Sequence, residues 1–415
     1  MPHRIPDGWT AALLPGITAL YKDLHSHPEL SGQEVRTAGV LAGALATLDY
    51  ETHTGVGGTG VVAVLRNGPG PTVMLRADID ALPVKENTGL PYASTRTAAG
   101  PDGAPVPVMH ACGHDMHAAC LVGAAHLLHG CRDTWSGTLL LVFQPAEELL
   151  TGARDMIADG FLDRFPVPDI VLAQHVAPLP AGVVGHREGE VMAGVDEAAV
   201  TLYGRGGHGA RPETTVDPVL LAASVVVRLQ SIVSRETPPQ EAAVLTVGRL
   251  QAGTTGNTVP DTAELSLTIR TYTERTRDAM RAAVERIVRA EAAAGACPAP
   301  PRIAWTTSAP VLVSDPEATR TTVTALARQL GPDRLVPMPP VMASEDVGAF
   351  GRAAGVPTVF WFWGGLAPEA VHAAADSPSE LPGNHAPAFA PVLRPTLETG
   401  VQNLTTAALA WLGQA

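Results

Sequence analysis

Along the first 195 residues, apolar and polar positions show two patterns, one typical of buried strands and one typical of helices. Short β-branched runs predict buried strands: "GVVAVLRN" (60–67), "TVMLRADID" (72–80), "GTLLLVFQPAEE" (137–148) and "DIVLAQHVAP" (169–178). The stretch 21–48 predicts two helices divided at His27–Pro28, because the residue before a proline avoids helical geometry. "MHAACLVGAAHLLHG" (116–130) predicts a further helix, with Asp115 placed to cap its start. Strands that alternate with helices predict an α/β sheet, parallel at least in its centre.

A second pattern follows, from near Asp196 to near Ala309. A strand (197–206), a helix (216–234), two strands (243–253 and 263–273), an amphipathic helix (275–295) and a final strand (302–308) give the order βαββαβ. This order predicts a compact ferredoxin-like domain. The α/β pattern then resumes with a helix (315–330), a strand (357–365) and a last helix. We therefore expect a first domain formed by 1–195 and 310–415, with 196–309 inserted into it.

Composition narrows the class of protein. A chain of 415 residues with 46% hydrophobic residues can form a large core and is long enough for two domains. The formal net charge of −13 argues against nucleic acid or an anionic membrane surface as a partner. No window approaches the roughly 18 uninterrupted apolar residues that a membrane span requires, and the N-terminus does not resemble a secretory signal. Four cysteines form no disulfide framework, so we expect a reducing, cytoplasmic setting.

Side chains of the types that bind metal ions follow three of the predicted strands. Asp78 ends one, Glu147 and Glu148 come just after a second, and His175 ends a third. In open α/β sheets, ligands collect at the carboxyl ends of strands. Adjacent carboxylates can divide their work, one binding a metal and the other acting as a general base, although a solvated pair of loop acids would look the same.

A cysteine and a histidine lie two apart in "HACGHDMH" (110–117), directly before a predicted helix. Cys112 and His114 can both reach a metal, or they form a buried thiol and a capping turn. His175 and His385 taken singly are ordinary structural histidines. Together with Cys112, His114 and Glu148 they complete an N/S/O set suited to two first-row divalent ions. We interpret His110 and His117 as supporting or structural.

Six motifs taken together make the family of this chain recognisable. "MLRADIDALPV", "MHACGHDMH", "LVFQPAEE", "GRGGHGARP", "GNTVPD" and "SEDVGAF" resemble the aminoacylase/carboxypeptidase family of two-metal exopeptidases, peptidase family M20. The best match is its amidohydrolase branch, which contains N-acyl-amino-acid amidohydrolases, hippurate hydrolases and auxin-conjugate hydrolases. The resemblance covers essentially the whole chain. It implies a zinc-exopeptidase-like catalytic domain with an inserted ferredoxin-like domain for lid and dimerisation roles.

The resemblance also implies roles for residues. The metal ligands would be Cys112, His114, Glu148, His175 and His385. Glu147 matches the catalytic base, and Asp78 looks like a supporting carboxylate that orients a metal-bound histidine, with a salt bridge to Arg76 as the alternative.

Three further residues of the inserted domain match family positions. His208 corresponds to a histidine that reaches the active site of the partner subunit and stabilises the oxyanion, although a plain turn histidine would look alike. Asn257 and Arg270 match groups that hold the substrate carboxylate, and for Arg270 an ordinary ion pair is the alternative.

The sequence departs from the usual family pattern at three places. Glu213 stands where histidine is common, Gln174 precedes His175, and "NHAPAFAPVLRPTLETG" (384–400) lacks the acidic residues that commonly follow the ligand histidine. These changes leave the expected ligands intact and bear on the substrate pocket.

The expected reaction is hydrolysis of the amide bond of N-acyl amino acids or related small amides by a metal-activated water, with Glu147 as base. The cofactors would be two divalent ions per subunit, with Zn, Mn and Co all compatible. The partners would be a small amide substrate and a second copy of the chain, in a homodimer or higher homo-oligomer. Three alternatives remain: a dipeptidase or carboxypeptidase with the same chemistry, a non-catalytic metal-binding protein, and a thiol redox enzyme. The absence of a Cys-x-x-Cys pair disfavours the last.

Overall fold

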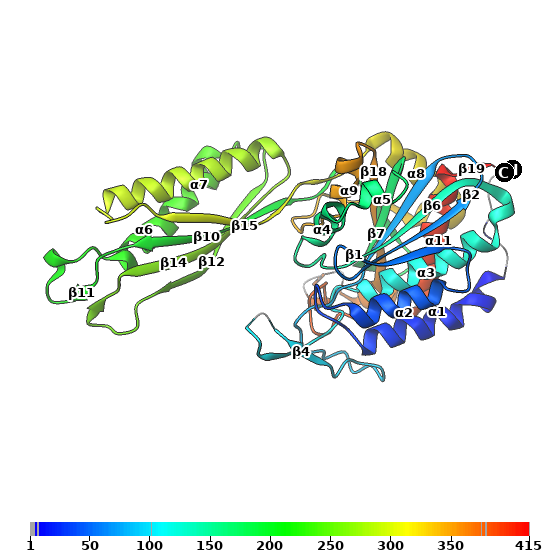
Figure 1. The fold of residues 1–415 in the computed structure, drawn as a ribbon, viewed down its shortest axis with the longest axis horizontal. Coiled ribbons are helices and arrows are strands. Elements are labelled where there is room, and N and C mark those ends of the chain that lie inside the picture. The colour runs from blue at the N-terminus through cyan, green and yellow to red at the C-terminus, as the bar shows by residue number, and fades with distance from the viewer. Residues whose placement is uncertain (1–4, 6–7, 101, 375, 378–379, 415) are drawn as a thin grey trace. The chain divides into compact units, whose positions relative to one another are not determined.

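The computed structural model describes residues 5, 8–100, 102–374, 376–377 and 380–414. The chain forms two compact units (Figure 1). The larger unit comprises Met1–Val191, Val313–Pro339 and Asp346–Ala415. The inserted unit comprises Met192–Leu312 together with Pro340–Glu345.

One mixed sheet forms the frame of the larger unit. Its strands are β1 Glu51–Val56, β2 Gly60–Asn67, β3 Thr72–Asp78, β6 Trp135–Gln144, β7 Ile170–Pro180, β8 Val184–His186, β17 Leu335–Pro337, β18 Thr358–Leu366 and β19 Gly413–Gln414. They lie in the order β1-β2-β6-β3-β7-β18-β8-β17, and β19 pairs with β6. The four central strands, β6, β3, β7 and β18, are parallel, as the sequence predicted, while β1 and β2 are antiparallel to their neighbours.

Helices cover both faces of this sheet (Figure 1). One face carries α1 Trp9–Ser26, α2 Val35–Leu45, α3 His114–Gly130, α8 Pro316–Leu330 and α11 Leu393–Trp411, and the other carries α4 Gly152–Ala158, α5 Phe161–Arg164 and α9 Gly348–Ala354. Alternate residues of β3 point to opposite faces, so Val73, Leu75 and Ala77 join the main core. Arg76, equally buried, lies on the opposite face, where it bonds to Gln144 and Asp346.

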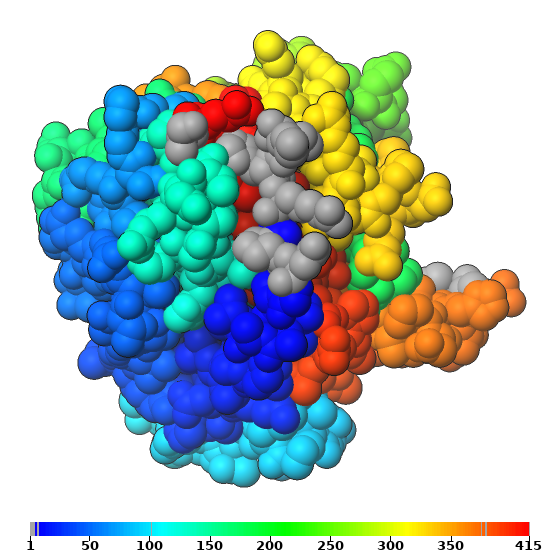
Figure 2. Space-filling model, turned by 90° about the vertical axis from the view of Figure 1, so that its right-hand side faces the viewer, coloured from blue at the N-terminus to red at the C-terminus, as the bar shows by residue number. Residues whose placement is uncertain are grey.

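The two ends of the chain share the face of the main core. Figure 2 shows blue N-terminal residues beside orange-red residues from near the C-terminus. α1 packs against both α3 and α11, through buried side chains such as Leu24, Leu128 and Leu404. This packing fixes the start of α3, where two of the predicted metal ligands lie.

The inserted unit has its own sheet and core. Its strands are β10 Gly194–Tyr203, β12 Ala243–Ala252, β14 Thr262–Thr271 and β15 Arg302–Ala309, in the order β12-β14-β10-β15, with helices α6 Pro218–Ser231 and α7 Glu274–Ala294. All described pairings in this sheet are antiparallel. Along the chain, these elements follow the order βαββαβ. Pro340–Glu345 joins this unit through Ala193, whose N–H bonds to the carbonyls of Val341 and Ala343.

One helical stretch, Pro218–Glu236, is long and apolar enough to cross a membrane by length and composition alone. It consists of α6 and a π-helical turn, Ile232–Glu236. Leu221, Val225 and Leu229 on one side of it belong to the core of the inserted unit. A core helix passes the same test, so no membrane location follows from it.

Shorter elements complete the chain. They are the β4–β5 hairpin (Thr97–Ala99 and Pro105–Pro107), β9 Gly189–Met192, β16 Leu312–Ser314, α10 Pro368–Ala373 and the two-residue strands β11 Gly207–His208 and β13 Thr258–Val259.

Two local expectations differ from the structure. The residue before α3 is Gly113 in a left-handed conformation, and Asp115 lies buried inside the first turn and bonds to His25 instead of capping the helix. β7 continues to Pro180, so His175 lies within the strand.

Candidate metal centre

The predicted ligands lie together at one edge of the central sheet. Cys112 Sγ lies 3.4 Å from His175 Nε2, and His385 Nε2 lies 3.2 Å from Glu148 Oε1. His114 Nε2 lies 3.8 Å from the same Glu148 oxygen. Five residues from four separate segments of the larger unit therefore form one cluster of nitrogen, sulfur and oxygen donors.

His114 has a buried nitrogen that faces carboxylates. Its Nδ1 bonds to Asp80 Oδ1 at 3.0 Å, while its Nε2 has no hydrogen-bond partner among the described residues. Oxygens of Asp78 and Glu147 lie 3.8 Å and 3.9 Å from that Nε2, in addition to Glu148. Burial lowers the pKa of His114, but Asp78, Cys112 and Asp80 together outweigh this effect and hold the pKa well above its usual range. The electrostatics thus favour a positive charge at this point.

Cys112 needs a nearby cation to ionise. It is 7% exposed, and burial raises the pKa of its thiol, as does the Glu148 carboxylate. A divalent ion reverses that preference and favours the thiolate. Gly113 separates Cys112 from His114 with φ +84°, and a Cβ there would lie 2.4 Å from Val176 Cγ1. Only glycine lets both ligands face the cluster at this turn.

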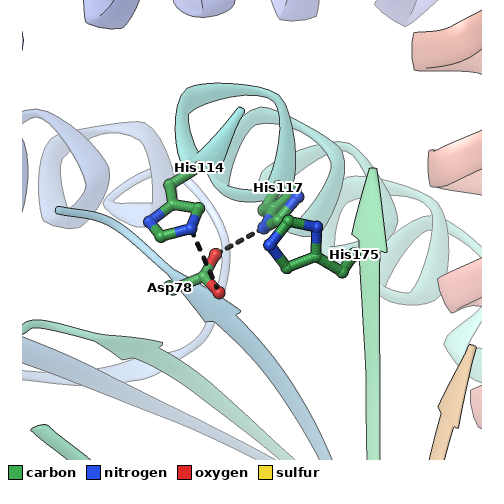
Figure 3. Close-up of side chains that lie close together, drawn as sticks. All are labelled: Asp78, His114, His117 and His175. Carbon is green, nitrogen blue, oxygen red and sulfur yellow. Dashed lines mark hydrogen bonds and ion pairs between the residues drawn. The ribbon is translucent and has the colours of Figure 1, made fainter. Parts of the chain in front are cut away.

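The histidines on α3 and β7 differ in what their nitrogens can do (Figure 3). His117 Nδ1 bonds to Asp78, and its Nε2 accepts the Val176 N–H at 2.9 Å, so neither nitrogen is open to a metal. His175 Nδ1 donates to the Val176 carbonyl at 2.8 Å, which leaves Nε2 directed at Cys112. Burial, together with His117, holds the pKa of His175 well below its usual range, so its ring is neutral, as a ligand requires.

His385 reaches the cluster from the loop before α11. Its backbone has φ +68°, which is unusual for a residue other than glycine, and its N–H donates to the Ala111 carbonyl at 2.8 Å. Hydrogen bonds to Cys112 and Glu148 raise the pKa of His385 to about 10. The preceding Asn384 donates its side-chain amide to the carbonyls of Cys112 and Val176. The loop is therefore tied to two segments that carry other predicted ligands.

Asp78 forms the ion pair with Arg76, and its histidine partner is His117, which is not one of the predicted ligands. Its Oδ2 accepts from Arg76 Nη1 at 2.7 Å, and its Oδ1 bonds to His117. The Arg76 guanidinium also donates to Gln144 and Asp346, so a fully buried charge network lies beneath the cluster. Burial raises the pKa of Asp78, but His114, His117 and Arg76 together hold it well below its usual range. The carboxylate is therefore ionised.

The loop after β6 presents the two adjacent glutamates. Ala146 and Leu150 on either side have φ +48° and +54°. Glu147 is 5% exposed and its Oε2 faces His114, while the Glu148 N–H donates to Asp80 Oδ2 at 3.0 Å. Left-handed backbone at two non-glycine positions is local strain of the kind that clusters at functional sites.

Sequence reasoning passed over three residues that hold this site together. Asp80, not Asp78, bonds to the ring of the predicted ligand His114, and it also holds the Glu148 amide. Asp346 accepts from Arg76 and from the Ala153 N–H, and Asn384 joins two ligand segments. The "ADID" alternation and the "SEDVGAF" motif carried signals for the two aspartates.

The inserted unit holds the other predicted residues. β11 and β13 pair His208 with Thr258, next to Asn257, so the structure brings two of them together. His208 is exposed, and its Nδ1 accepts the Ala210 N–H at 3.0 Å. Arg270 Nη1 donates to the Met342 carbonyl and to Ser344 Oγ, both inside this unit.

The departures from the family pattern have different consequences. Gln174 is buried on the side of β7 away from His175, where its side chain bonds to Trp361 and to the Gly400 carbonyl. It is part of the core and does not line the metal cluster. Glu213 forms an exposed ion pair with Arg211.

Nitrogen, thiol and carboxylate donors suit a first-row divalent ion better than Ca²⁺ or Mg²⁺, which prefer oxygen. The bare, buried His114 Nε2 and the three carboxylate oxygens around it fit such an ion. Cys112, Glu148 and His385 offer ligand atoms within 4.8 Å of one another, as do His114, Glu147 and Glu148. The donor set therefore has the chemistry of a metal centre.

Comparisons with known proteins agree with this chemistry. Residues 74–381 match Peptidase family M20/M25/M40. The chain is 40% identical over 267 residues to an N-acetyl-L-cysteine deacetylase from Bacillus subtilis, which covers 64% of this chain and 61% of that protein. It is 37% identical over 331 residues to a hippurate hydrolase from Campylobacter jejuni, covering 79% and 82% of the two chains.

A solved structure extends the likeness to the whole fold. The crystal structure of a dinuclear metal-binding peptidase of the M20 family from Bacillus subtilis superposes with a TM-score of 0.76 at 30% identity, covering 96% of this chain and 98% of that one. Fold, site and relatives define a metallo-amidohydrolase. This chain belongs to Peptidase family M20/M25/M40, in the amidohydrolase branch that its motifs predicted.

Proposed function

We propose that this enzyme hydrolyses the amide bond of N-acyl amino acids, with Glu147 as the general base beside two divalent ions. The observation that carries the proposal is the His114 Nε2, which has no hydrogen-bond partner among the described residues and faces three carboxylates, Glu147 among them. The relatives named above act on N-acetyl-L-cysteine and hippurate, both of them N-acyl amino acids.

Five residues would hold the ions: Cys112, His114, Glu148, His175 and His385. Zn, Mn and Co are all compatible with this donor set. When bound, the ions would polarise the amide carbonyl and lower the pKa of the attacking water. The dinuclear relative supports a count of two.

Glu147 would move the proton. Its Oε2 faces the cluster and would accept a proton from the attacking water, then return it to the nitrogen of the leaving amine. Its near-complete burial keeps bulk water away from that proton. Asp78 would hold the His117 ring in place, and Asp80 would hold the His114 ring in place.

The inserted unit would supply the substrate-binding groups. We propose that residues 196–309 act as lid and dimerisation domain between catalytic segments 1–195 and 310–415. His208 would assist the oxyanion in the active site of a partner subunit, and Asn257 and Arg270 would hold the substrate carboxylate. A homodimer in the cytoplasm, with no nucleic-acid or membrane partner, remains our expectation.

A substrate panel tests the proposal. The purified protein is stripped with a chelator, reloaded with Zn, Mn or Co, and assayed on N-acetyl and N-benzoyl amino acids and on dipeptides. We expect metal-dependent release of the free amino acid from an N-acyl subset. Cleavage that requires a free α-amino group would favour the dipeptidase alternative, and no turnover of any substrate despite bound metal would contradict the proposal.

A further inference from the structure

A segment far from the metal ligands in sequence contacts the loop that carries Glu147. Glu34 precedes α2 and is fully buried. Its Oε1 accepts the Ala146 N–H at 2.9 Å and the Gly32 N–H at 2.8 Å, and its Oε2 accepts the Thr59 hydroxyl at 2.5 Å. Three donors from three parts of the chain therefore converge on this one carboxyl group.

The contact falls at the strained point of the loop. Ala146 directly precedes Glu147 and has φ +48°, a conformation that alanine rarely adopts. Such a conformation persists only where surrounding contacts hold it. The hydrogen bond from the Ala146 N–H to a buried carboxyl group is a contact of that kind.

The other side of Glu147 is held in the same way. The Glu148 N–H donates to Asp80 Oδ2, and Ser31, three residues before Glu34, donates its hydroxyl to that same oxygen at 2.6 Å. The amide before Glu147 and the amide after it are thus each bonded to a buried carboxyl group. The segment 31–34 reaches both, one through Glu34 directly and the other through Ser31 and Asp80.

We propose that Glu34 is a positioning residue for Glu147. It holds Ala146 in the left-handed conformation that directs the Glu147 carboxylate at the metal cluster. The proposal rests on the proposed function for the role of Glu147, while the hydrogen bond to Ala146 can be tested independently of turnover. The hydrogen bonds of Glu34 go to Ala146, Gly32 and Thr59 and not to a proposed metal ligand, so Glu34 would touch neither substrate nor metal.

Two substitutions of matched size separate hydrogen bonding from simple filling of space. Glu34→Gln keeps an oxygen that can accept from Ala146 and Gly32, and its amide can donate to the Thr59 hydroxyl. Glu34→Met fills a similar volume and leaves the Ala146 amide without its acceptor. We expect kcat of Glu34→Gln within about threefold of wild type. We expect Glu34→Met to lose about tenfold or more in kcat, with KM and metal content little changed.

Hydrogen exchange gives the readout that does not depend on activity. In metal-loaded protein, the peptide covering 145–152 should exchange faster in Glu34→Met than in wild type, and at the wild-type rate in Glu34→Gln. Gln33→Met is the matched control, because the side chain of the exposed neighbour Gln33 donates to the Ala99 carbonyl, which lies outside the 145–152 loop. It should change neither exchange nor kcat.

A milder pair covers the case in which Glu34→Met does not fold. Thr59→Val removes one donor to Glu34 at a half-buried position, and Thr59→Ser keeps it. Thr59→Val should show smaller changes in the same direction, and Thr59→Ser none. Wild-type exchange of 145–152 in both Glu34→Met and Thr59→Val would overturn the proposal, as would equal losses of kcat in Glu34→Gln and Glu34→Met. If wild type hydrolyses no substrate, the proposed function fails, and exchange alone still decides whether Glu34 holds the loop.

Discussion

At the scale of single residues, turnover should depend most strongly on the Glu147 carboxylate. Glu147→Gln keeps the size of the side chain but cannot accept a proton, so kcat should fall by about 10²–10⁴-fold. Metal content, measured by mass spectrometry of the purified protein, should stay at the wild-type level, because Cys112, His114 and His385 are untouched. Glu148→Gln is the contrasting variant and should lose metal as well as turnover. Near-normal turnover in Glu147→Gln would remove this residue from the base role.

A buried histidine outside the metal cluster should make stability depend on pH. His25 lies between two carboxylates, with Nδ1 2.6 Å from Asp115 and Nε2 3.0 Å from Glu86. Burial lowers the pKa of His25, but the hydrogen bonds to Asp115 and Glu86 outweigh this effect and raise the pKa to about 10. The folded pKa thus lies above the unfolded value near 6.5. The stabilisation is therefore complete below about pH 6.5 and is lost as pH rises toward 10.

The measurement is the free energy of unfolding in urea from pH 6 to pH 10, for wild type and His25→Gln. The variant lacks the charge, so the advantage of wild type over it should shrink across this window. The slope should approach about 1.4 kcal/mol per pH unit at most. A difference that stays constant with pH would show that His25 is neutral in the folded protein.

At the scale of elements, the start of α3 decides whether two proposed ligands, Cys112 and His114, face the same point. Gly113→Ala places a Cβ 2.4 Å from Val176 Cγ1 in a backbone with φ +84°, so the turn must shift. We expect a loss of about 1–3 kcal/mol in stability and a weaker affinity for Zn or Co, measured by titration. Gly130→Ala, at the other end of α3 with nothing within 4 Å of the added Cβ, is the matched control. Equal metal affinity in the two variants would contradict this account of the turn.

The elements that sequence reasoning found are those with a strong local pattern. β3, β6 and β7 are apolar along most of their length because they are buried on both faces, so each stood out as a run. β1 is half exposed and contains Gly55, and α4, α5 and α9 have seven residues or fewer, so no period could develop. Asp115 was read as a cap because its true partner, His25, lies 90 residues away.

The residues of the candidate site likewise divide into those that the sequence indicated and those that it did not. Its proposed ligands were found because cysteine, histidine and glutamate have few other uses in such motifs. Glu34, Asp80 and Asn384 were missed as supports because they act largely through backbone amides and carbonyls. A peptide group is the same at every position, so a hydrogen bond to it leaves no pattern in the sequence.

At the scale of the whole molecule, the inserted unit carries most of the large apolar side chains that remain exposed. Leu220 is 68% exposed and Val227 74%, on the side of α6 away from its core, and Leu250 on the edge strand β12 is 48% exposed. Exposed apolar side chains on one small unit make it the candidate surface for the dimer proposed above. Together with the edge of β12, whose second side is free of any described strand, they suit a second copy of the same unit.

Val227→Glu should therefore convert the proposed dimer into a monomer, measured by sedimentation velocity. Burying an unpaired charge at the centre of an apolar contact costs more free energy than the contact contributes. Val35→Glu is the matched control, because Val35 is equally exposed, at 71%, but lies in the larger unit. If His208 acts in the active site of the partner subunit, the Val227→Glu monomer should keep its metal and lose turnover. A fully active monomer would contradict that role for His208, and a dimer as stable as wild type would place the contact elsewhere.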